Sequence, residues 1–334
     1  MKKLAFVVGG ACLLFLVGCQ KELSGDFTTY TGHPLNDTIW VRNLPSGAQV
    51  HELVSLLAPD IIVDSFEVSK DTTLKYGDSL EVNFTVGCCT NPNGTAVTGG
   101  KARLEIYRLK KKGDFIKAFA ATTSNNYPLE TAGGFFVRVI KEGKELVMAP
   151  TGSIKIRFSD TEDPKPNMQV FNGKEGNPLP VSGIDTSFTW TRDTDTSWIK
   201  TFQKTGTGGL VKGYEMTIKN LRWTCAERFN DTAKNKTKIF AILPLNYTNK
   251  NTVVYAVYAD QKTVVQLKAD YASRSFAAPN IPLATKLKIV TISKIGDDMY
   301  LGTRDVNDVG SVVAYSISPE KKSLKDILQF LNTL

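Results

Sequence analysis

The stretch "SLEVNFTV" (residues 79–86) decides the fold class of this 334-residue chain. Its apolar residues alternate with Glu81, Asn83 and Thr85, so an extended backbone would place the apolar side chains on one face and the polar ones on the other. Alternation over the length of a strand is typical of an antiparallel sheet with one buried face. The stretch therefore predicts a β-strand that contributes one face to a core.

Similar segments surround this stretch, each short, rich in β-branched and aromatic residues, and bounded by turn clusters such as "NPNG" (91–94). The predicted strands of this first region are 61–68, 79–86, 102–109, 134–140, 144–148 and 153–158. Because no helical pattern lies between them, they predict an antiparallel β-sandwich over residues 60–165.

A second β region follows a connecting segment, residues 166–209, and covers residues 210–334. Its predicted strands are 214–223, 238–243, 252–258, 262–267, 286–293, 299–305 and 311–317. Turn clusters again separate the strands, among them "APN" (278–280). The pattern predicts a second β-sandwich.

Two short helices complete the expected fold. One is predicted within residues 19–59, where apolar residues recur every three or four positions before Pro59. The other closes the chain, with Ser318 as N-cap and Pro319 at its first position. Its apolar stripe consists of Leu324, Ile327, Leu328 and Leu331. The sequence thus predicts an all-β protein: two antiparallel β-sandwich domains with a short N-terminal helix and a C-terminal amphipathic helix.

The first residues have the composition of a secretory leader. Lys2 and Lys3 precede an apolar run, Leu4–Val17, that is shorter than the roughly 20 residues a membrane span needs. "LVGC" (16–19) resembles the lipobox of bacterial lipoproteins, in which the cysteine receives a diacylglycerol. The resemblance implies a signal peptide over residues 1–18 and lipidation of Cys19; the alternative is a signal cleaved elsewhere, with Cys19 incidental.

A lipid on Cys19 would tether the mature chain to a membrane without spanning it. Lys21-Glu22 resembles the surface-export tag of lipoproteins in Bacteroidota, and it would place the chain on the outer membrane, facing the exterior. A periplasmic orientation remains the alternative. Residues 19–59 would then be the tether and the short helix.

The formal charge of +8 raises the question of nucleic-acid binding. The basic residues are dispersed, however, and the single cluster, Lys110–Lys112, comes where a predicted strand ends. We interpret that cluster as a solvated hairpin tip. The sequence therefore predicts no nucleic-acid partner.

Three cysteines remain outside the leader and the lipidation site: Cys88, Cys89 and Cys225. Adjacent cysteines rarely bridge each other without strain, so an oxidising compartment would pair Cys225 with one of the vicinal residues or leave all three free. The two histidines share no ligand spacing with these cysteines. The sequence predicts no metal site and no cofactor.

The segment "FTWTRDTDTSW" (188–198) has two interpretations. Trp190 and Trp198, together with Trp223, could stack on sugar rings as a binding platform. Alternatively, the segment is an alternating strand with one aromatic face and a turn at Asp193–Asp195.

Five stretches resemble a family of Bacteroidota surface lipoproteins of unknown function. They are "DSFEVSKDTTLKYGDSLEVNF" (64–84), "TAVTGGKARLEIYRLKKKGDFIKAFAATTSNN" (95–126), "GGFFVRVIKEGKELVMAP" (133–150), "LRWTCAERFN" (221–230) and "TKIFAILPLNYTNKNTVVYAVY" (237–258). The first half also resembles ZU5-type β-sandwiches. This chain departs from the family at Ala226 and at Cys88-Cys89. The resemblance implies a fold and a location, and it carries no catalytic residues.

No catalytic motif accompanies this fold pattern. The chain has no Gly-x-Ser-x-Gly motif, while a pair of carboxylates for glycoside hydrolysis would leave no sequence signature. We expect a non-catalytic, lipid-anchored envelope protein that acts as a surface scaffold or docks other envelope proteins. The alternative is a carbohydrate-binding surface lipoprotein of a polysaccharide-uptake system.

Short Asp-Thr signals predict modification. Thr38, Thr72 and Thr232 each follow an aspartate and fit the three-residue O-glycosylation signal that the family resemblance implies. Asp-Thr pairs also occur simply as turn and cap residues, because their side chains bond nearby backbone amides.

Overall fold

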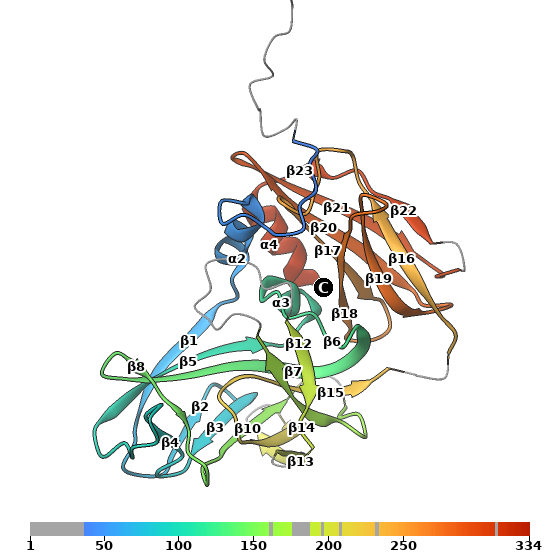
Figure 1. Ribbon diagram of the computed structural model, residues 1–334. Coiled ribbons are helices and arrows are strands. Elements are labelled where there is room, and N and C mark those ends of the chain that lie inside the picture. Colours follow the sequence, from blue (N-terminus) through green and yellow to red (C-terminus); the bar gives the residue numbers. More distant parts are fainter. Residues whose placement is uncertain are drawn as a thin grey trace, which may run out of the picture. The chain divides into compact units, whose positions relative to one another are not determined.

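A computed structural model describes residues 37–159, 163–175, 188–194, 197–206, 209–230, 234–310 and 313–334. The signal peptide, Cys19 and Thr232 lie outside these ranges. Residues Thr38–Leu334 form one compact unit (Figure 1). None of the helices in the described ranges has the length and apolar character that crossing a membrane would require.

Strand is the dominant secondary structure of the described residues, which confirms the all-β expectation. The first sheet has the order β1 (Ile61–Glu67), β5 (Lys101–Leu109), β7 (Tyr127–Lys141), β15 (Arg222–Phe229), β11 (Gln169–Lys174) and β12 (Thr189–Arg192), with β6 (Thr123–Ser124) and β8 (Lys144–Glu145) beside β7. The second sheet has the order β13 (Trp198–Gly206), β14 (Gly209–Ile218), β10 (Ile154–Ser159), β3 (Leu80–Phe84) and β2 (Thr72–Lys75). A small ribbon pairs β4 (Cys89–Thr90) with β9 (Val147–Met148).

The first and second sheets share one apolar core. Leu80, Val82 and Phe84 of β3 are buried in it, and the ring of Phe84 stacks on that of Phe66 with centroids 4.1 Å apart. The alternation that predicted this strand is therefore confirmed, although β3 ends at Phe84 and Val86 is exposed.

Residues 166–209 are more than a connector. They contain β11, β12 and β13, and all three strands belong to the first two sheets. The next strands, β14 and β15, pair with β10 and β7, so the stretch 214–223 also lies outside the second region where it was expected. Alternation identifies a strand from local sequence, but it carries no information about which strand becomes its neighbour.

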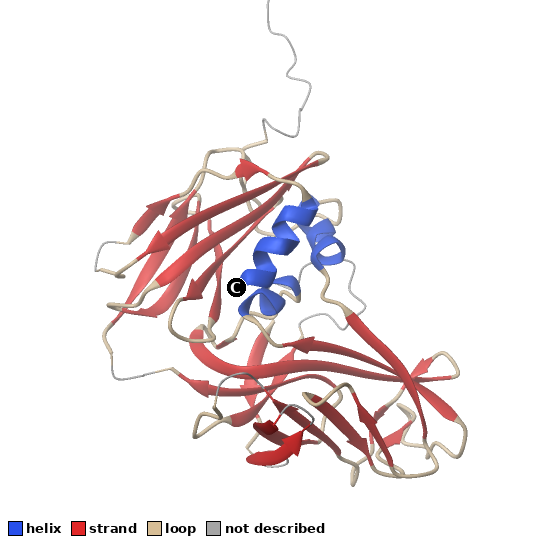
Figure 2. Cartoon of the chain, turned by 180° about the vertical axis from the view of Figure 1, so that it is seen from behind, coloured by secondary structure: helices blue, strands red, loops and turns tan. Residues whose placement is uncertain are grey.

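The third sheet curls into a half-barrel (Figure 2). Its order is β22 (Ala314–Ser316), β16 (Lys236–Ile242), β19 (Ser275–Pro282), β18 (Val264–Asp270), β17 (Thr252–Tyr258), β20 (Leu287–Ile295), β21 (Asp298–Val306) and β23 (Glu320–Lys321). The residues 278–280, expected as a turn, lie inside β19. Its register with β16 shifts at this point and Asn280 has φ +62°, a bulge that accommodates Pro279.

Four short helical segments, η2 (Gln49–His51), α2 (Glu52–Leu57), α3 (Lys112–Lys117) and α4 (Leu324–Thr333), gather in one region (Figure 2). Leu53, Phe115 and Leu331, from α2, α3 and α4, share a core with residues of the first and third sheets. The C-terminal helix starts later than predicted. Its N-cap is Ser323, whose Oγ accepts the N–H of Asp326, because β23 occupies the residues just before it.

The lysine cluster is not a hairpin tip. Lys111 is the N-cap residue of α3, and its Nζ donates to the carbonyl of Asn332, 2.8 Å away. The Nζ of Lys112 donates to the carbonyl of Tyr258 at 2.7 Å. A six-residue helix is too short to leave a readable periodicity in the sequence, so α3 could not be expected from the pattern alone.

Candidate functional site

Two adjoining cavities, of about 600 and 520 Å³, lie along β18. Arg42, Gln266, Lys268 and Tyr271 line both of them. We refer to the two cavities together as the cleft. Its size is within the range of pockets that hold small molecules or short polymers.

The cleft arises from a change of partner along β18. Residues Val264–Leu267 pair with β17, whereas Lys268–Asp270 pair with β19. Each neighbour is therefore paired with β18 along only part of the strand, and the two cavities are lined by residues on either side of it. Two of the residues that line the larger cavity, Ala269 and Ala277, have small side chains that occupy little of its volume.

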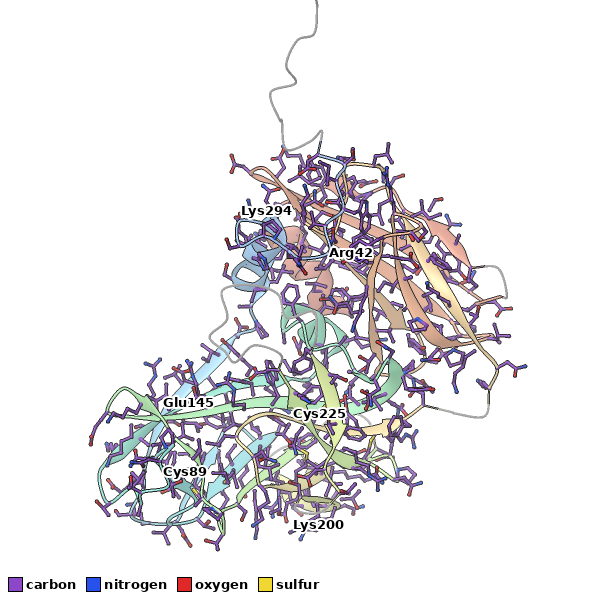
Figure 3. All side chains as sticks on the ribbon, viewed as in Figure 1. Arg42, Cys89, Glu145, Lys200, Cys225 and Lys294 are labelled. Atoms are coloured by element: carbon purple, nitrogen blue, oxygen red, sulfur yellow. The ribbon has the colours of Figure 1, made fainter. Side chains whose placement is uncertain are left out.

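The wall of the cleft comes from the segment that follows Asp37. The ring of Trp40 packs on Phe276 with centroids 4.9 Å apart. The side chain of Asn249 donates to the carbonyl of Val41 at 2.6 Å and accepts its N–H at 3.2 Å. The hydroxyl of Tyr271 donates to the carbonyl of Arg42 at 3.5 Å. These contacts fix the backbone of Arg42 beside the third sheet, where Figure 3 labels it.

The cleft carries uncompensated positive charge. Arg42 and Lys268 are exposed, and no carboxylate of the described residues pairs with either. Lys238 differs, because its Nζ lies 2.6 Å from Oδ2 of Asp270. That hydrogen bond from Lys238 lowers the pKa of Asp270. The two unpaired cations give the cleft a positive field.

The tryptophans that could have formed a sugar platform lie largely inside the core. Trp190 is fully buried and Trp223 nearly so, with ring centroids 6.4 Å apart in an edge-to-face arrangement. Neither can present a ring face to a sugar. Trp198 is 45% exposed on the edge strand β13, and the Nζ of Lys200 lies 5.5 Å from the centroid of its ring.

Sequence reasoning missed the aromatic residues that do line the cleft. Tyr271, 42% exposed, and the half-buried Phe188 both line the larger cavity. Phe188 was part of the segment considered for stacking, and its ring stands edge-to-face on the buried Trp190 at 5.2 Å. Tyr271 follows a predicted strand as an isolated turn residue, so no pattern singled it out.

Cys88, Cys89 and Cys225 are free and buried, which corresponds to the second of the two alternatives that the sequence left open for Cys225. The Sγ of Cys225 lies 3.0 Å from Oγ1 of Thr131 and donates to the carbonyl of Gly133 at 3.2 Å. The Sγ atoms of Cys88 and Cys89 lie 3.7 Å apart, in the separate core between the first two sheets. Burial raises the pKa of the Cys225 thiol, which suits a packing role better than nucleophilic chemistry.

Glu227 is a buried carboxyl that the sequence did not reveal. It is fully buried on β15, and neither carboxyl oxygen has a hydrogen-bond partner among the described residues. Burial raises its pKa well above the usual value, because an ionised carboxylate would be desolvated there. Glu227 does not line the cleft.

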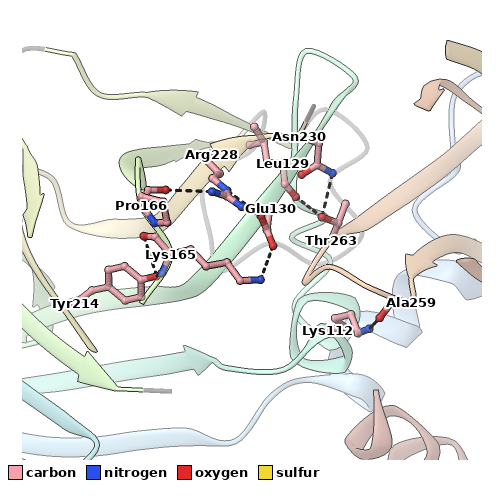
Figure 4. Close-up of polar contacts among 10 residues, drawn as sticks. All are labelled: Lys112, Leu129, Glu130, Lys165, Pro166, Tyr214, Arg228, Asn230, Ala259 and Thr263. Carbon is pink, nitrogen blue, oxygen red and sulfur yellow. Dashed lines mark hydrogen bonds and ion pairs between the residues drawn. The ribbon is translucent and has the colours of Figure 1, made fainter. Parts of the chain in front are cut away.

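An ion-pair cluster around the buried Glu130 holds the first sheet near its contact with the third (Figure 4). Oε1 of Glu130 lies 2.6 Å from Nζ of Lys165, and Oε2 lies 2.6 Å from a guanidinium nitrogen of Arg228. Thr263, from the third sheet's side of the contact, donates to the carbonyl of Leu129 at 2.9 Å and accepts from Asn230 at 3.2 Å. The cluster is structural, since none of these side chains lines the cleft.

The threonines predicted to carry O-glycans lie apart from one another in the chain. Thr38 is exposed, whereas Thr72 is half-buried and its hydroxyl donates to the carbonyl of Lys70 at 3.3 Å. O-glycosylation at these residues stays a prediction. No group of three or more His, Cys, Asp or Glu residues in the described ranges could hold a metal ion.

Comparison with known proteins adds no assignment. No protein-family model matches the chain, and neither the curated proteins nor the solved structures contain a match to it.

Proposed function

We propose that this protein is a lipid-anchored, non-catalytic module of the cell envelope that binds a partner in the cleft. The observation that carries the proposal is the construction of the cleft wall. The side chain of Asn249 holds the backbone of Val41, and the hydroxyl of Tyr271 holds that of Arg42, beside two adjoining cavities. A pre-formed concavity with fixed polar groups suits recognition, because little ordering is needed on binding.

The location in this proposal rests on the leader. Cys19 would carry the lipid and anchor the chain to the outer membrane, with its exterior orientation inferred from Lys21-Glu22. Arg42 follows Cys19 closely in sequence, so even a fully extended tether would keep the cleft within about 80 Å of the bilayer. The partner would therefore be another envelope protein or a glycan at the cell surface.

We further propose that the first and second sheets form one antiparallel sandwich, which their shared core supports. The curled third sheet, with its own interior core, would take the place of the second sandwich. We also propose the relationship to the Bacteroidota surface lipoproteins, and the ZU5-like character of the first sandwich, on the stretches quoted above.

A second function is favoured by the aromatic residues of the cleft. Tyr271 and Phe188 provide ring surface beside the amide of Gln266. Rings beside hydrogen-bonding side chains are suited to sugars, whose faces are apolar and whose edges carry hydroxyls. The protein would then be a carbohydrate-binding lipoprotein of a polysaccharide-uptake system.

Two measurements test the proposal. Cys19→Ser should move the protein from the membrane fraction to the soluble fraction, whereas Cys225→Ser should leave it membrane-bound. Retention of the Cys19→Ser protein in the membrane would refute the anchor. Tryptophan fluorescence of the mature protein, titrated with a glycan panel, should change where a ligand contacts Phe188, because Phe188 packs on Trp190. A panel without any response would remove the glycan function and leave a protein partner.

A further inference from the structure

We propose that the cleft selects an anionic oligosaccharide, one that carries carboxylates on its sugars, with Arg42 and Lys268 as the cationic contacts and Tyr271 as the stacking residue. This inference rests on the proposed binding function and specifies its ligand. It goes beyond the function because a scaffold or an uptake protein could equally take a neutral partner.

The charge of the cleft favours an anion. Among the described residues that line it, Asp270 is the one acid, and Lys238 neutralises it. Arg42 and Lys268 line both cavities, and no acidic side chain in the described part of the chain pairs with either. Two cations left unpaired in a concave site attract an anionic ligand and hold it there. A neutral sugar would leave both of them without a partner.

The geometry of Arg42 favours a carboxylate in particular. Its backbone is held by the hydroxyl of Tyr271, and its neighbour Val41 is held on both sides by Asn249. A guanidinium on a fixed backbone can donate two parallel hydrogen bonds to a planar carboxylate with a small entropy cost. Lys268, a point charge on β18, can contact a second carboxylate or the same one.

The remaining lining favours a sugar over an acidic peptide. Tyr271 is 42% exposed while its hydroxyl is bonded, so a ring face is available in a fixed orientation. An extended peptide would bind by adding a strand to a free sheet edge. Here β18 is joined to β17 along one half and to β19 along the other, so neither side offers an uninterrupted edge. Two adjoining cavities suit consecutive sugar units.

The test compares the binding of a charged oligosaccharide with that of its uncharged methyl ester. The acylated mature chain, in detergent, is titrated calorimetrically with a galacturonate hexamer and with the same hexamer methyl-esterified at every carboxyl. We expect the acid to bind at least about tenfold more tightly than the ester, which is the scale of a charge-assisted hydrogen bond. The affinity for the acid should fall as the salt concentration is raised.

Variants at three residues of the cleft locate the binding site. Arg42→Gln and Lys268→Gln should each weaken binding of the acid at least about tenfold and narrow the gap between acid and ester. Tyr271→Phe keeps the ring but loses the hydroxyl that holds Arg42, so it should bind the ester as the wild type does and the acid less tightly, whereas Tyr271→Ala should weaken binding of both ligands. Lys325→Gln is the matched control, because it removes the same charge from an exposed residue of α4 outside the cleft. Unchanged melting temperatures would show that the variants are folded.

Several outcomes would overturn the inference. Equal binding of acid and ester would remove the charge selection while leaving a glycan-binding cleft. If Arg42→Gln and Lys268→Gln lose no more affinity for the acid than Lys325→Gln does, the oligosaccharide binds outside the cleft. Stronger binding of an oligoglutamate peptide than of the galacturonate would assign the cleft to an acidic protein. Absence of binding to either hexamer would reject the sugar ligand, while the fractionation experiment would still decide the anchored-module proposal.

Discussion

Gly113 of α3 lies against Leu331 of α4 so closely that a Cβ on Gly113 would stand 1.8 Å from the carbonyl oxygen of Leu331. The close approach joins the helix after β5 to the last helix of the chain. Lys111 reinforces it by donating to the carbonyl of Asn332. The contact explains why a glycine follows Lys112 in a helix, where it otherwise costs about 1 kcal/mol relative to alanine.

Gly113→Ala should destabilise the protein by about 2 kcal/mol or more, because α3 and α4 must separate to admit the methyl group. Urea unfolding measures the loss. Gly47→Ala is the control, since nothing lies within 4 Å of the Cβ position there. Equal midpoints for the two variants would contradict the contact.

Glu227 should give the protein a stability that falls as pH rises. Burial raises the pKa of Glu227 in the folded state above the unfolded value of about 4.3, so the folded protein keeps a proton that the unfolded chain releases. The contribution of Glu227 to stability should therefore be greatest below about pH 4.3 and be lost as the pH rises through the raised folded pKa. Glu227→Gln should flatten this decline, as measured by urea unfolding between pH 4 and pH 8. Glu320→Gln, at an exposed carboxylate, should keep the wild-type slope. Parallel profiles for wild type and Glu227→Gln would count against a buried neutral carboxyl.

Glu130 should have the opposite effect on the pH dependence of stability. Burial alone would raise its pKa, but hydrogen bonds and ion pairs with Lys165 and Arg228 outweigh burial and lower it. Its contribution to stability is therefore present above about pH 4.3 and is lost as the pH falls through the lower folded pKa. Glu130→Gln should cost about 1–3 kcal/mol at pH 7, since both cations are partly exposed, and less at pH 3. A loss that is the same at both pH values would mean that packing, and not charge, is responsible.

Cys88, Cys89 and Cys225 should resist alkylation in the folded protein, because all three are buried. After denaturation without reductant, the acylated mature chain should take up three alkyl groups, as intact mass would show. Uptake of a single group would reveal a disulfide and contradict the free thiols. Cys225→Ser should then lower the count to two, which separates this residue from the vicinal pair.

The alternation of apolar and polar residues predicted the strands well, because it arises within each strand from the burial of one face. In "SLEVNFTV" (79–86), burial of every second side chain is a property of one strand against one core, and β3 has that face. The segments that became β19 and α3 lack such a local pattern. Pro279 suggested a turn, yet a bulge accommodates it, and α3 is too short to show a helical period.

The candidate site could not be predicted in the same way. Trp190 and Trp223 have the residue type of a sugar platform, but whether a ring is buried depends on what packs over it. Arg42 and Lys268 are ordinary basic residues, distant in sequence, and neither belongs to a motif. Their shared cleft exists because β18 changes partners and because Asn249 and Tyr271 hold the segment of Arg42 against the third sheet.

The sequence by itself determined the β class of the chain, because the alternation of apolar and polar residues is set within each strand. It also determined the presence of the short helix before β1 and of the apolar stripe of the last helix, both read from helical spacing. The tertiary structure alone decided that β14 and β15 join the first two sheets, and it alone brought Arg42 and Lys268 to the same cleft. Those pairings depend on contacts between residues far apart in the chain, and the free energy of such contacts is a property of the packed molecule and not of any single segment.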